Sequence, residues 1–422
     1  MMKRLKNIVW WSILSSAMLL IGGCGQQPKE AALQKPGAGK EQTSSPQPTQ
    51  ATHKPILLAV AAPFTGDSSE FGVQIKMAVE LAAEELNAKG GVAGRPIQLM
   101  LEDDAGNPAE AYNVATKIAS NPDVLAVIGH FNSSCSLAAK SAYTEAKMVM
   151  FSPASTNVNV TKNSDYVFRN IFTDDFQGQS LARYAGEILG AKKVGILFDN
   201  DDYGRGLKES FKKKAESLGV SIVSETAYAK DTNDFRSQLT TMQSYQPDLL
   251  LVAGLYKHAA VIAKQARELG IKTPLIGGDG VFSEQFITLA GPAAEGTYVS
   301  CPFLFELGGE RAKKFAEQFR AKYNREPDAW AALSYDAFQL IIKAIETKGP
   351  TREGIHQYLK SINSPAAAYD GLTGKTYFDK EGDCRKPVQM AVVKGGHFVA
   401  AEKQLTIEEQ ARSAKNDTQT TK

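Results

Sequence analysis

Short apolar runs alternate with amphipathic stretches from residue 55 onward. Most of the runs are continuous rather than alternating in polarity, which is typical of parallel strands buried on both faces. Apolar residues in the intervening stretches recur every three to four positions, which predicts helices. This alternation predicts an α/β fold with two doubly wound, Rossmann-like lobes. The predicted strands lie at residues 56–61, 97–101, 124–128, 148–151, 193–198, 220–226, 248–252 and 273–276.

A block of four helical patterns follows the last of these strands. We expect the chain to return to the first lobe there, so that both lobes are discontinuous and joined by crossing hinge segments. The first lobe would comprise residues 55–172 plus 302–383, and the second 173–301 plus 384–402. A hairpin of residues 375–378 with 388–393 is expected near the end. Such an arrangement suits hinge closure around a ligand.

The N-terminus resembles a bacterial lipoprotein signal peptide. Basic residues precede an apolar stretch at 8–21, and small residues lead to Cys24. We therefore expect a signal peptide over residues 1–23 and a lipid on Cys24, which would hold the protein outside the cytoplasm on a membrane. The stretch is short for a permanent transmembrane helix. Residues 24–54 and 403–422 are polar and predict a disordered tether and tail.

Charge and motif content argue against several function classes. The 48 basic and 46 acidic residues nearly cancel, and no basic stripe interleaved with aromatics suggests nucleic acid as a partner. The sequence contains no nucleophile elbow and no pair of histidines at metal-binding spacing. We therefore expect no enzymatic activity, no metal site and no cofactor. The acidic run 102–104 is interpreted as strand-end caps in preference to a metal site, and His130 as a packed residue in preference to a base.

Hydroxyl residues follow two of the predicted strands. Residues 128–135 and 151–156 both end in small hydroxyl side chains, and Ser133 or Ser134 could cap the next helix. In open α/β sheets, ligands bind at the carboxyl ends of strands, where helix N-termini offer free amides. The two stretches therefore predict a cradle for a small carboxylate.

The second half of the chain offers the complementary groups. Tyr203 and Tyr256 each follow a predicted strand, and Asp279 lies between glycines after the next. These side chains would face the cradle across the cleft. An ammonium group paired with Asp279 in a closed cleft is stabilised more than an exposed pair, because solvent is excluded. The pattern predicts a zwitterionic ligand.

Seven short motifs in order resemble the type 1 periplasmic binding proteins of the leucine/isoleucine/valine-binding group, over residues 56–399. They are Ala62–Gly66, Leu86–Gly91, Asp103–Asp104, Val127–His130, Pro153–Thr156, Tyr203–Gly206 and Gly278–Gly280. The resemblance implies the type 1 periplasmic binding protein fold and a set of ligand contacts. Ser133 and Thr156 would bind the α-carboxylate. The Ala154 carbonyl, Thr156 and Asp279 would bind the α-ammonium.

The same resemblance assigns the rest of the pocket. Tyr203 and Tyr256 would close over the ligand, Phe71 would line its side-chain pocket, and Ala154 and Ser155 would shape the floor. Family members carry a glutamate where this chain has Asp279, and a disulfide where it has Gly106 and Asn132. Cys135 is therefore expected to be a free buried residue. Because the pattern puts Cys301 and Cys384 near crossing segments, we predict a disulfide between them.

Together these patterns predict a monomeric, lipid-anchored solute-binding protein for an ATP-driven (ABC) importer, without catalytic activity of its own. The expected ligand is an α-amino acid, branched-chain or otherwise apolar, and the expected partner is a membrane permease. Two alternatives stay open at this point. The same cleft could bind an amide or an aromatic acid, or the protein could be a sensory receptor domain.

Overall fold

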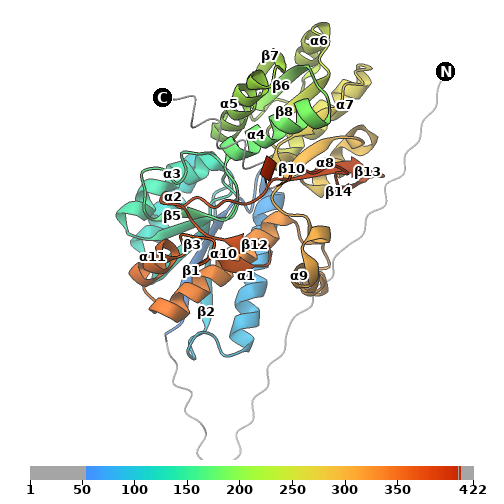
Figure 1. Ribbon diagram of the computed structural model, residues 1–422. Coiled ribbons are helices and arrows are strands. Elements are labelled where there is room, and N and C mark those ends of the chain that lie inside the picture. The colour runs from blue at the N-terminus through green and yellow to red at the C-terminus, as the bar shows by residue number, and fades with distance from the viewer. Residues whose placement is uncertain (1–53, 407, 410–422) are drawn as a thin grey trace, which may run out of the picture. The chain divides into compact units, whose positions relative to one another are not determined.

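The computed structural model describes residues 54–406, 408 and 409 (Figure 1). The predicted signal peptide, Cys24, nearly all of the tether and most of the tail lie outside the described residues. Within the described part of the chain, no helix is long and apolar enough to cross a membrane.

The first sheet has five parallel strands in the order β2-β1-β3-β4-β5. Its central strands are buried on both faces, as the continuous apolar runs predict: Ala59, Val60 and Ala61 are inaccessible to solvent. The strands are β1 (Ile56–Ala62), β2 (Ile97–Asp103), β3 (Val124–Gly129), β4 (Val149–Ser152) and β5 (Val167–Arg169). The connecting helices are α1 (Ser69–Ala88), α2 (Pro108–Ser120) and α3 (Ser133–Glu145).

The second sheet has seven strands in the order β14-β13-β10-β9-β8-β6-β7, and β13 runs antiparallel to both of its neighbours while the other pairs are parallel. The strands are β6 (Lys193–Asp199), β7 (Ser221–Tyr228), β8 (Leu249–Ala253), β9 (Leu275–Gly277), β10 (Tyr298–Cys301), β13 (Gln389–Lys394) and β14 (His397–Ala400). The helices are α4 (Asp174–Arg183), α5 (Asp202–Ser217), α6 (Arg236–Ser244), α7 (Tyr256–Glu268) and α8 (Glu284–Ala290).

The helices after β10 return to the elements of the first sheet. They are α9 (Gly309–Tyr323), α10 (Ala329–Lys348) and α11 (Arg352–Ser361). Helices α10 and α11 contact the strands of that sheet, and α9 contacts α1. In Figure 1 the orange helices α10 and α11 lie among the blue and cyan elements of the first sheet. Arg352 at the start of α11 donates to the carbonyl oxygens of Asn121 (2.7 Å) and Val124 (2.9 Å). We call the five-stranded sheet with its helices the first lobe and the seven-stranded sheet with its helices the second lobe. The predicted residue limits of the lobes stay a prediction.

The predicted hairpin of residues 375–378 with 388–393 is wrong. β12 (Gly374–Thr376) pairs with β11 (Tyr369–Gly371), whereas β13 pairs with β10 and β14. The Asp336 carboxylate accepts hydrogen bonds from the backbone of Leu372 and Thr373 and so keeps the β11–β12 turn against α10. The apolar run of β13 instead extends the second sheet, where it is buried beside β10.

The predicted disulfide between Cys301 and Cys384 is also wrong, since both residues are free and buried. Cys301 ends β10, and its thiol donates to the Gln389 carbonyl of the neighbouring strand at 3.5 Å. Cys384 is instead held in a backbone bridge with Phe378. Cys135 is free and buried, as predicted. Burial raises the pKa of the Cys301 and Cys384 thiols, which lowers the fraction of the reactive thiolate at both residues.

Candidate ligand-binding site

The first half of the site lies where β3 runs into α3. Neither Ser133 nor Ser134 caps the helix: the N-cap residue is Asn132, without a side-chain capping bond. The Ser133 hydroxyl instead accepts from the Asn157 amide at 3.2 Å, and the Ser134 hydroxyl donates to Asp202 of the second lobe at 2.6 Å. The first-turn amides of α3 have no partner within the helix and are available to an anion.

The loop after β4 is held by its own hydroxyl groups. Ser152 donates to the His130 carbonyl (2.8 Å) and accepts from the Ser155 amide (2.9 Å). The Ser155 hydroxyl donates to the Phe131 carbonyl (2.9 Å) and lies 2.7 Å from the Ser136 hydroxyl. Ser155 therefore uses its hydroxyl to support the loop, and its neighbours Ala154 and Thr156 form the wall of the cavity.

The second half of the site pairs a tyrosine with a carboxylate. Tyr203, in the first turn of α5, donates its hydroxyl to Asp279 Oδ1 at 2.7 Å and accepts from the Gly280 amide at 3.1 Å. Tyr203 is 7% exposed and Asp279 only 3%. Burial raises the pKa of the Asp279 carboxyl group, which forms no salt bridge with any described residue that would offset the lost hydration. This carboxylate is therefore poised to gain from a positively charged ligand group.

A small cavity lies between these two halves. The space in it that a water molecule could occupy is only about 20 Å³, which is room for about one water, so an amino acid needs the two halves to move slightly apart. Five of the predicted residues line it together: Ser133, Ala154, Thr156, Tyr203 and Asp279. The remaining lining residues are Phe131, Asn132, Asp201, Leu255, Gly280 and Trp330.

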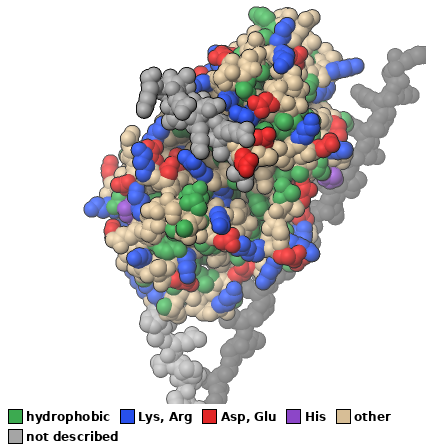
Figure 2. Space-filling model, in the orientation of Figure 1, with side chains coloured by type: hydrophobic (Ala, Val, Ile, Leu, Met, Phe, Trp, Pro, Cys, Tyr) green, Lys and Arg blue, Asp and Glu red, His purple; other side chains and the backbone are tan. Residues whose placement is uncertain are grey.

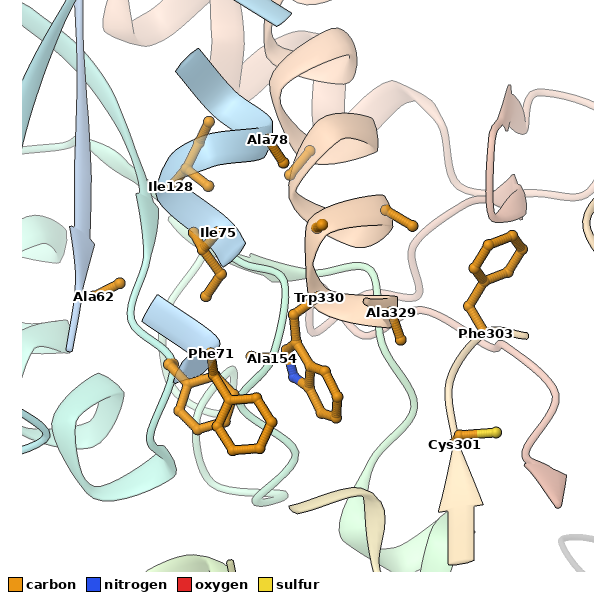
Figure 3. Close-up of a cluster of buried hydrophobic side chains, with 14 of the residues drawn as sticks. Ala62, Phe71, Ile75, Ala78, Ile128, Ala154, Cys301, Phe303, Ala329 and Trp330 are labelled. Carbon is orange, nitrogen blue, oxygen red and sulfur yellow. The ribbon is translucent and has the colours of Figure 1, made fainter. Parts of the chain in front are cut away.

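Phe71 and Tyr256 lie behind the wall of the cavity. The Phe71 ring stacks on Phe131 with 4.5 Å between centroids, lies 4.7 Å from Trp330, and meets Tyr256 edge-on at 5.4 Å. Figure 3 shows Phe71 and Trp330 side by side near Ala154, from two different helices. The aromatic rings thus form a continuous apolar wall that spans both lobes. No described residue forms a hydrogen bond with the buried Trp330 indole Nε1.

Two acidic residues that sequence reasoning missed belong to the same region. Asp174 starts α4 and is buried, and neither carboxylate oxygen makes a hydrogen bond of good geometry. Burial raises its pKa well above the usual range, and the nearby Asp279 adds to this effect, while the Thr156 hydroxyl opposes it. Asp201 lines the cavity, and burial together with the Asp199 carboxylate raises its pKa to about 7. Asp201 is half-buried and is the N-cap of α5, where it accepts from the Gly204 amide. Its place in the acidic turn before Tyr203 was visible in the sequence, but its position at the cavity was not.

The two lobes touch at the rim of the cavity. The Asn157 side chain donates to the Asp202 carbonyl at 2.6 Å, beside the Ser134–Asp202 bond. Lys257 pairs with Asp67 at 2.7 Å across the same boundary. A Cβ atom at Gly206 would lie 2.9 Å from Asn157 Nδ2, so the glycine at position 206 leaves the space in which the Asn157 side chain reaches Asp202. These bonds describe a closed arrangement of the lobes.

The other polar residues singled out in the sequence have structural roles. His130 is fully buried between Asp104 (2.6 Å) and the Tyr143 hydroxyl (3.1 Å), which confirms that it is packed. Asp103 accepts from the Phe64 amide and the Thr65 hydroxyl and so caps the first loop. Among the described residues, no group of three or more potential ligand side chains could hold a metal ion.

The family model described as "periplasmic binding protein" matches residues 55–397 of the chain. The chain belongs to this family. Membership implies a location outside the cytoplasm and a role in binding solutes. It also confirms the type 1 periplasmic binding protein fold, together with the structural relatives below.

Several relatives of this periplasmic binding protein carry informative names. It is 32% identical to the Leu/Ile/Val-binding protein homolog 2 of Brucella abortus, over 78% of this chain and 87% of the relative. The leucine-binding protein LivK of Thermotoga maritima matches with a TM-score of 0.79 and 34% identity, covering 84% of this chain and 99% of that one. LivJ of Streptococcus pneumoniae, solved with isoleucine, matches with a TM-score of 0.78 and 32% identity, covering 82% and 99%.

Proposed function

We propose that this protein captures a small α-amino acid with an apolar side chain between its lobes and delivers it to an ABC importer in the membrane. One observation carries the proposal. Asp279, a buried carboxyl group that forms no salt bridge with any described residue, shares a small cavity with Thr156 and with Ser133 in the first turn of α3. Such a cavity is complementary to a molecule with an ammonium group and a carboxylate on adjacent atoms.

The first lobe would bind the carboxylate end. The Ser133 and Thr156 hydroxyls line the cavity beside the first turn of α3, whose free amides favour negative charge. The second lobe would bind the ammonium end through Asp279, with the Ala154 carbonyl and Thr156 completing the contacts. Asp174 would strengthen this end, because a bound ammonium group lowers the cost of ionising two nearby buried carboxyl groups.

The aromatic wall would receive the side chain of the ligand. Phe131, Leu255 and Trp330 line the cavity directly, with Phe71 and Tyr256 behind them. Burial of an aliphatic side chain there contributes about 25 cal/mol per Å² of apolar area removed from water. The names of the relatives, which refer to leucine, isoleucine and valine, support an aliphatic ligand.

A lipid on Cys24 would keep the protein beside its permease as a monomer on the outer side of a membrane. A Cys24→Ala variant should then move from the membrane fraction to the soluble fraction, with unchanged ligand affinity. If the variant stays in the membrane fraction, the proposed lipid anchor is wrong, while the proposed ligand binding is not affected.

The ligand class is tested by calorimetric titration of the mature chain with a panel of matched molecules. Leucine, isoleucine and valine should bind, whereas 4-methylpentanoate, which lacks the amino group, and 3-methylbutylamine, which lacks the carboxylate, should not. At a hundredfold excess over its dissociation constant, a true ligand should add about 2.7 kcal/mol to the free energy of unfolding. If 4-methylpentanoate, benzoate or acetamide binds and no amino acid does, the ligand is an acid or an amide and the proposed zwitterionic ligand is wrong.

Transport is tested separately from ligand binding. Membrane vesicles that contain the permease and ATPase encoded beside this protein should take up leucine only when the protein is added. Ligand binding without any stimulated uptake, together with a kinase encoded beside the protein, would instead favour the sensory role.

A further inference from the structure

A buried arginine behind the ligand-binding loop is the starting point. Arg169 is the last residue of β5 and is 0% exposed. Its Nη1 donates to the carbonyl oxygens of Ser155 (2.8 Å) and Asn157 (2.9 Å), Nη2 to the Thr161 hydroxyl (3.0 Å), and Nε to Asp383 Oδ1 (2.7 Å). A buried guanidinium group is tolerated when its donors and its charge are matched in this way.

The two carbonyl groups that Arg169 holds lie on either side of Thr156. Thr156 lines the cavity, and its own carbonyl accepts from the Asp174 amide at the start of α4 (2.7 Å). The opposite side of the same loop is held by the Ser152 and Ser155 hydroxyls. The guanidinium group therefore determines the orientation of the peptide groups next to the residue that meets the ligand.

Arg169 also reaches two segments that cross between the lobes. The chain leaves β5 directly after Arg169 and enters α4 of the second lobe at Asp174. Asp383 precedes the segment that enters β13, and its carboxylate also accepts from the Thr161 hydroxyl at 2.8 Å. The Arg169 amide donates to the Gly382 carbonyl at 3.1 Å. One side chain thus joins the ligand-binding loop to both crossings.

We propose that Arg169 is a positioning residue for ligand binding, which fixes the loop of residues 154–157 and links it through Asp383 to the crossing segments. This inference rests on the proposed function for its ligand readout. Lysine cannot replace arginine here, because a single ammonium group lacks the planar fork that reaches two carbonyls, a hydroxyl and a carboxylate at once.

The chain offers a matched control in Arg352. Its side chain, which is half-buried where that of Arg169 is fully buried, lies in the first lobe and likewise donates to main-chain carbonyl groups, including those of Asn121 (2.7 Å) and Ala146 (3.0 Å). None of these partners lines the ligand cavity. Arg352→Lys should therefore reproduce the loss of fold stability from a disrupted arginine without any change at the ligand-binding loop.

The experiment compares Arg169→Lys, Asp383→Asn and Arg352→Lys in the full mature chain. Three quantities are measured: urea unfolding without ligand, amide hydrogen exchange at residues 154, 155 and 157 without ligand, and calorimetric affinity for leucine. The amides of Ala154 and Ser155 donate to the Ser152 hydroxyl, and the Asn157 amide donates to the Ser133 hydroxyl, so all three are protected from exchange while the loop keeps its conformation. We expect Arg169→Lys to accelerate exchange at these amides and to weaken leucine binding by about tenfold or more, which is 1.4 kcal/mol. Asp383→Asn should act in the same direction but less.

The inference is overturned if Arg169→Lys leaves loop exchange and leucine affinity within about twofold of the wild type, or if Arg352→Lys changes both to the same extent. If Arg169→Lys does not fold, Asp383→Asn decides by the same two criteria. If the wild-type protein binds no amino acid, the proposed function fails, and the exchange comparison alone still decides whether Arg169 positions the loop.

Discussion

A methyl group placed at Gly206 should separate ligand affinity from fold stability. Gly206 lies inside α5, and a Cβ atom there would lie 2.7 Å from Asp174 Oδ2 and 2.9 Å from Asn157 Nδ2 in the closed arrangement. Both distances are shorter than real Cβ contacts, so the Asn157 side chain of the first lobe and the α5 helix of the second would have to move apart. The clash with Asn157 exists only when the lobes are closed.

Two opposing magnitudes follow for Gly206→Ala. Alanine in a helix interior stabilises the fold by about 0.5–1 kcal/mol relative to glycine. An extra methyl group in a packed contact costs about 1–3 kcal/mol, and only the part that comes from Asn157 depends on closure, because Asp174 lies in the same lobe as Gly206. We therefore expect leucine affinity to fall between about 5-fold and 150-fold. In the ligand-free protein the clash with Asp174 remains and opposes the gain in helix stability, so the free energy of unfolding should change less than the free energy of leucine binding.

The assay is calorimetric titration with leucine alongside urea unfolding of the ligand-free variant. Asn157→Ala combined with Gly206→Ala should recover part of the lost affinity, because the shorter side chain removes one of the two clashes. Unchanged affinity in Gly206→Ala would refute the reasoning, since it would mean that ligand binding does not require the contact between Gly206 and Asn157.

Two further predictions concern the buried acids. Asp279→Asn should weaken leucine binding by about 2 kcal/mol or more, because the ammonium group of the ligand loses its counter-charge. The same variant should stabilise the ligand-free protein against urea at pH 8, because the carboxyl group of raised pKa no longer has to ionise there. Equal leucine affinity of variant and wild type in calorimetry would exclude Asp279 as the ammonium partner. The pKa of Asp201 is about 7 in the folded protein, against 3.8 as the ordinary value that applies when the chain is unfolded. Between these two pH values only the folded protein holds the proton, so the free energy of unfolding falls as the pH rises, by up to about 1.4 kcal/mol per pH unit. Urea unfolding across this window should show a smaller decline in Asp201→Asn, and an identical pH profile would contradict the assignment.

The sequence predicted those parts of the molecule that depend on local pattern. Continuous apolar runs gave the buried parallel strands, because a strand covered on both faces needs apolar residues throughout. The residues predicted at the strand ends, Ser133, Thr156, Tyr203 and Asp279, all line one cavity. This was predictable because the carboxyl ends of the strands in such sheets lie beside the ligand-binding crevice. The visible face of the described residues in Figure 2, where Lys and Arg are interspersed with Asp and Glu, agrees with the near-neutral composition.

The errors concern contacts between residues distant in sequence. The pairing of β13 with β10 depends on a neighbour about ninety residues earlier, which no local alternation reveals. The same is true of Cys301, whose partner is a carbonyl group on β13 rather than a second thiol. Trp330 reaches the cavity because the chain returns to the first lobe, so its role could not be inferred from its own helix.

A crystal structure of the mature protein with leucine tests the central claim most directly. The account predicts closed lobes, with the ligand carboxylate beside Ser133 and the first turn of α3, and the ammonium nitrogen within hydrogen-bond distance of Asp279. A ligand in the opposite orientation, with its carboxylate toward Asp279, or a ligand bound outside the cavity between the lobes, would contradict it.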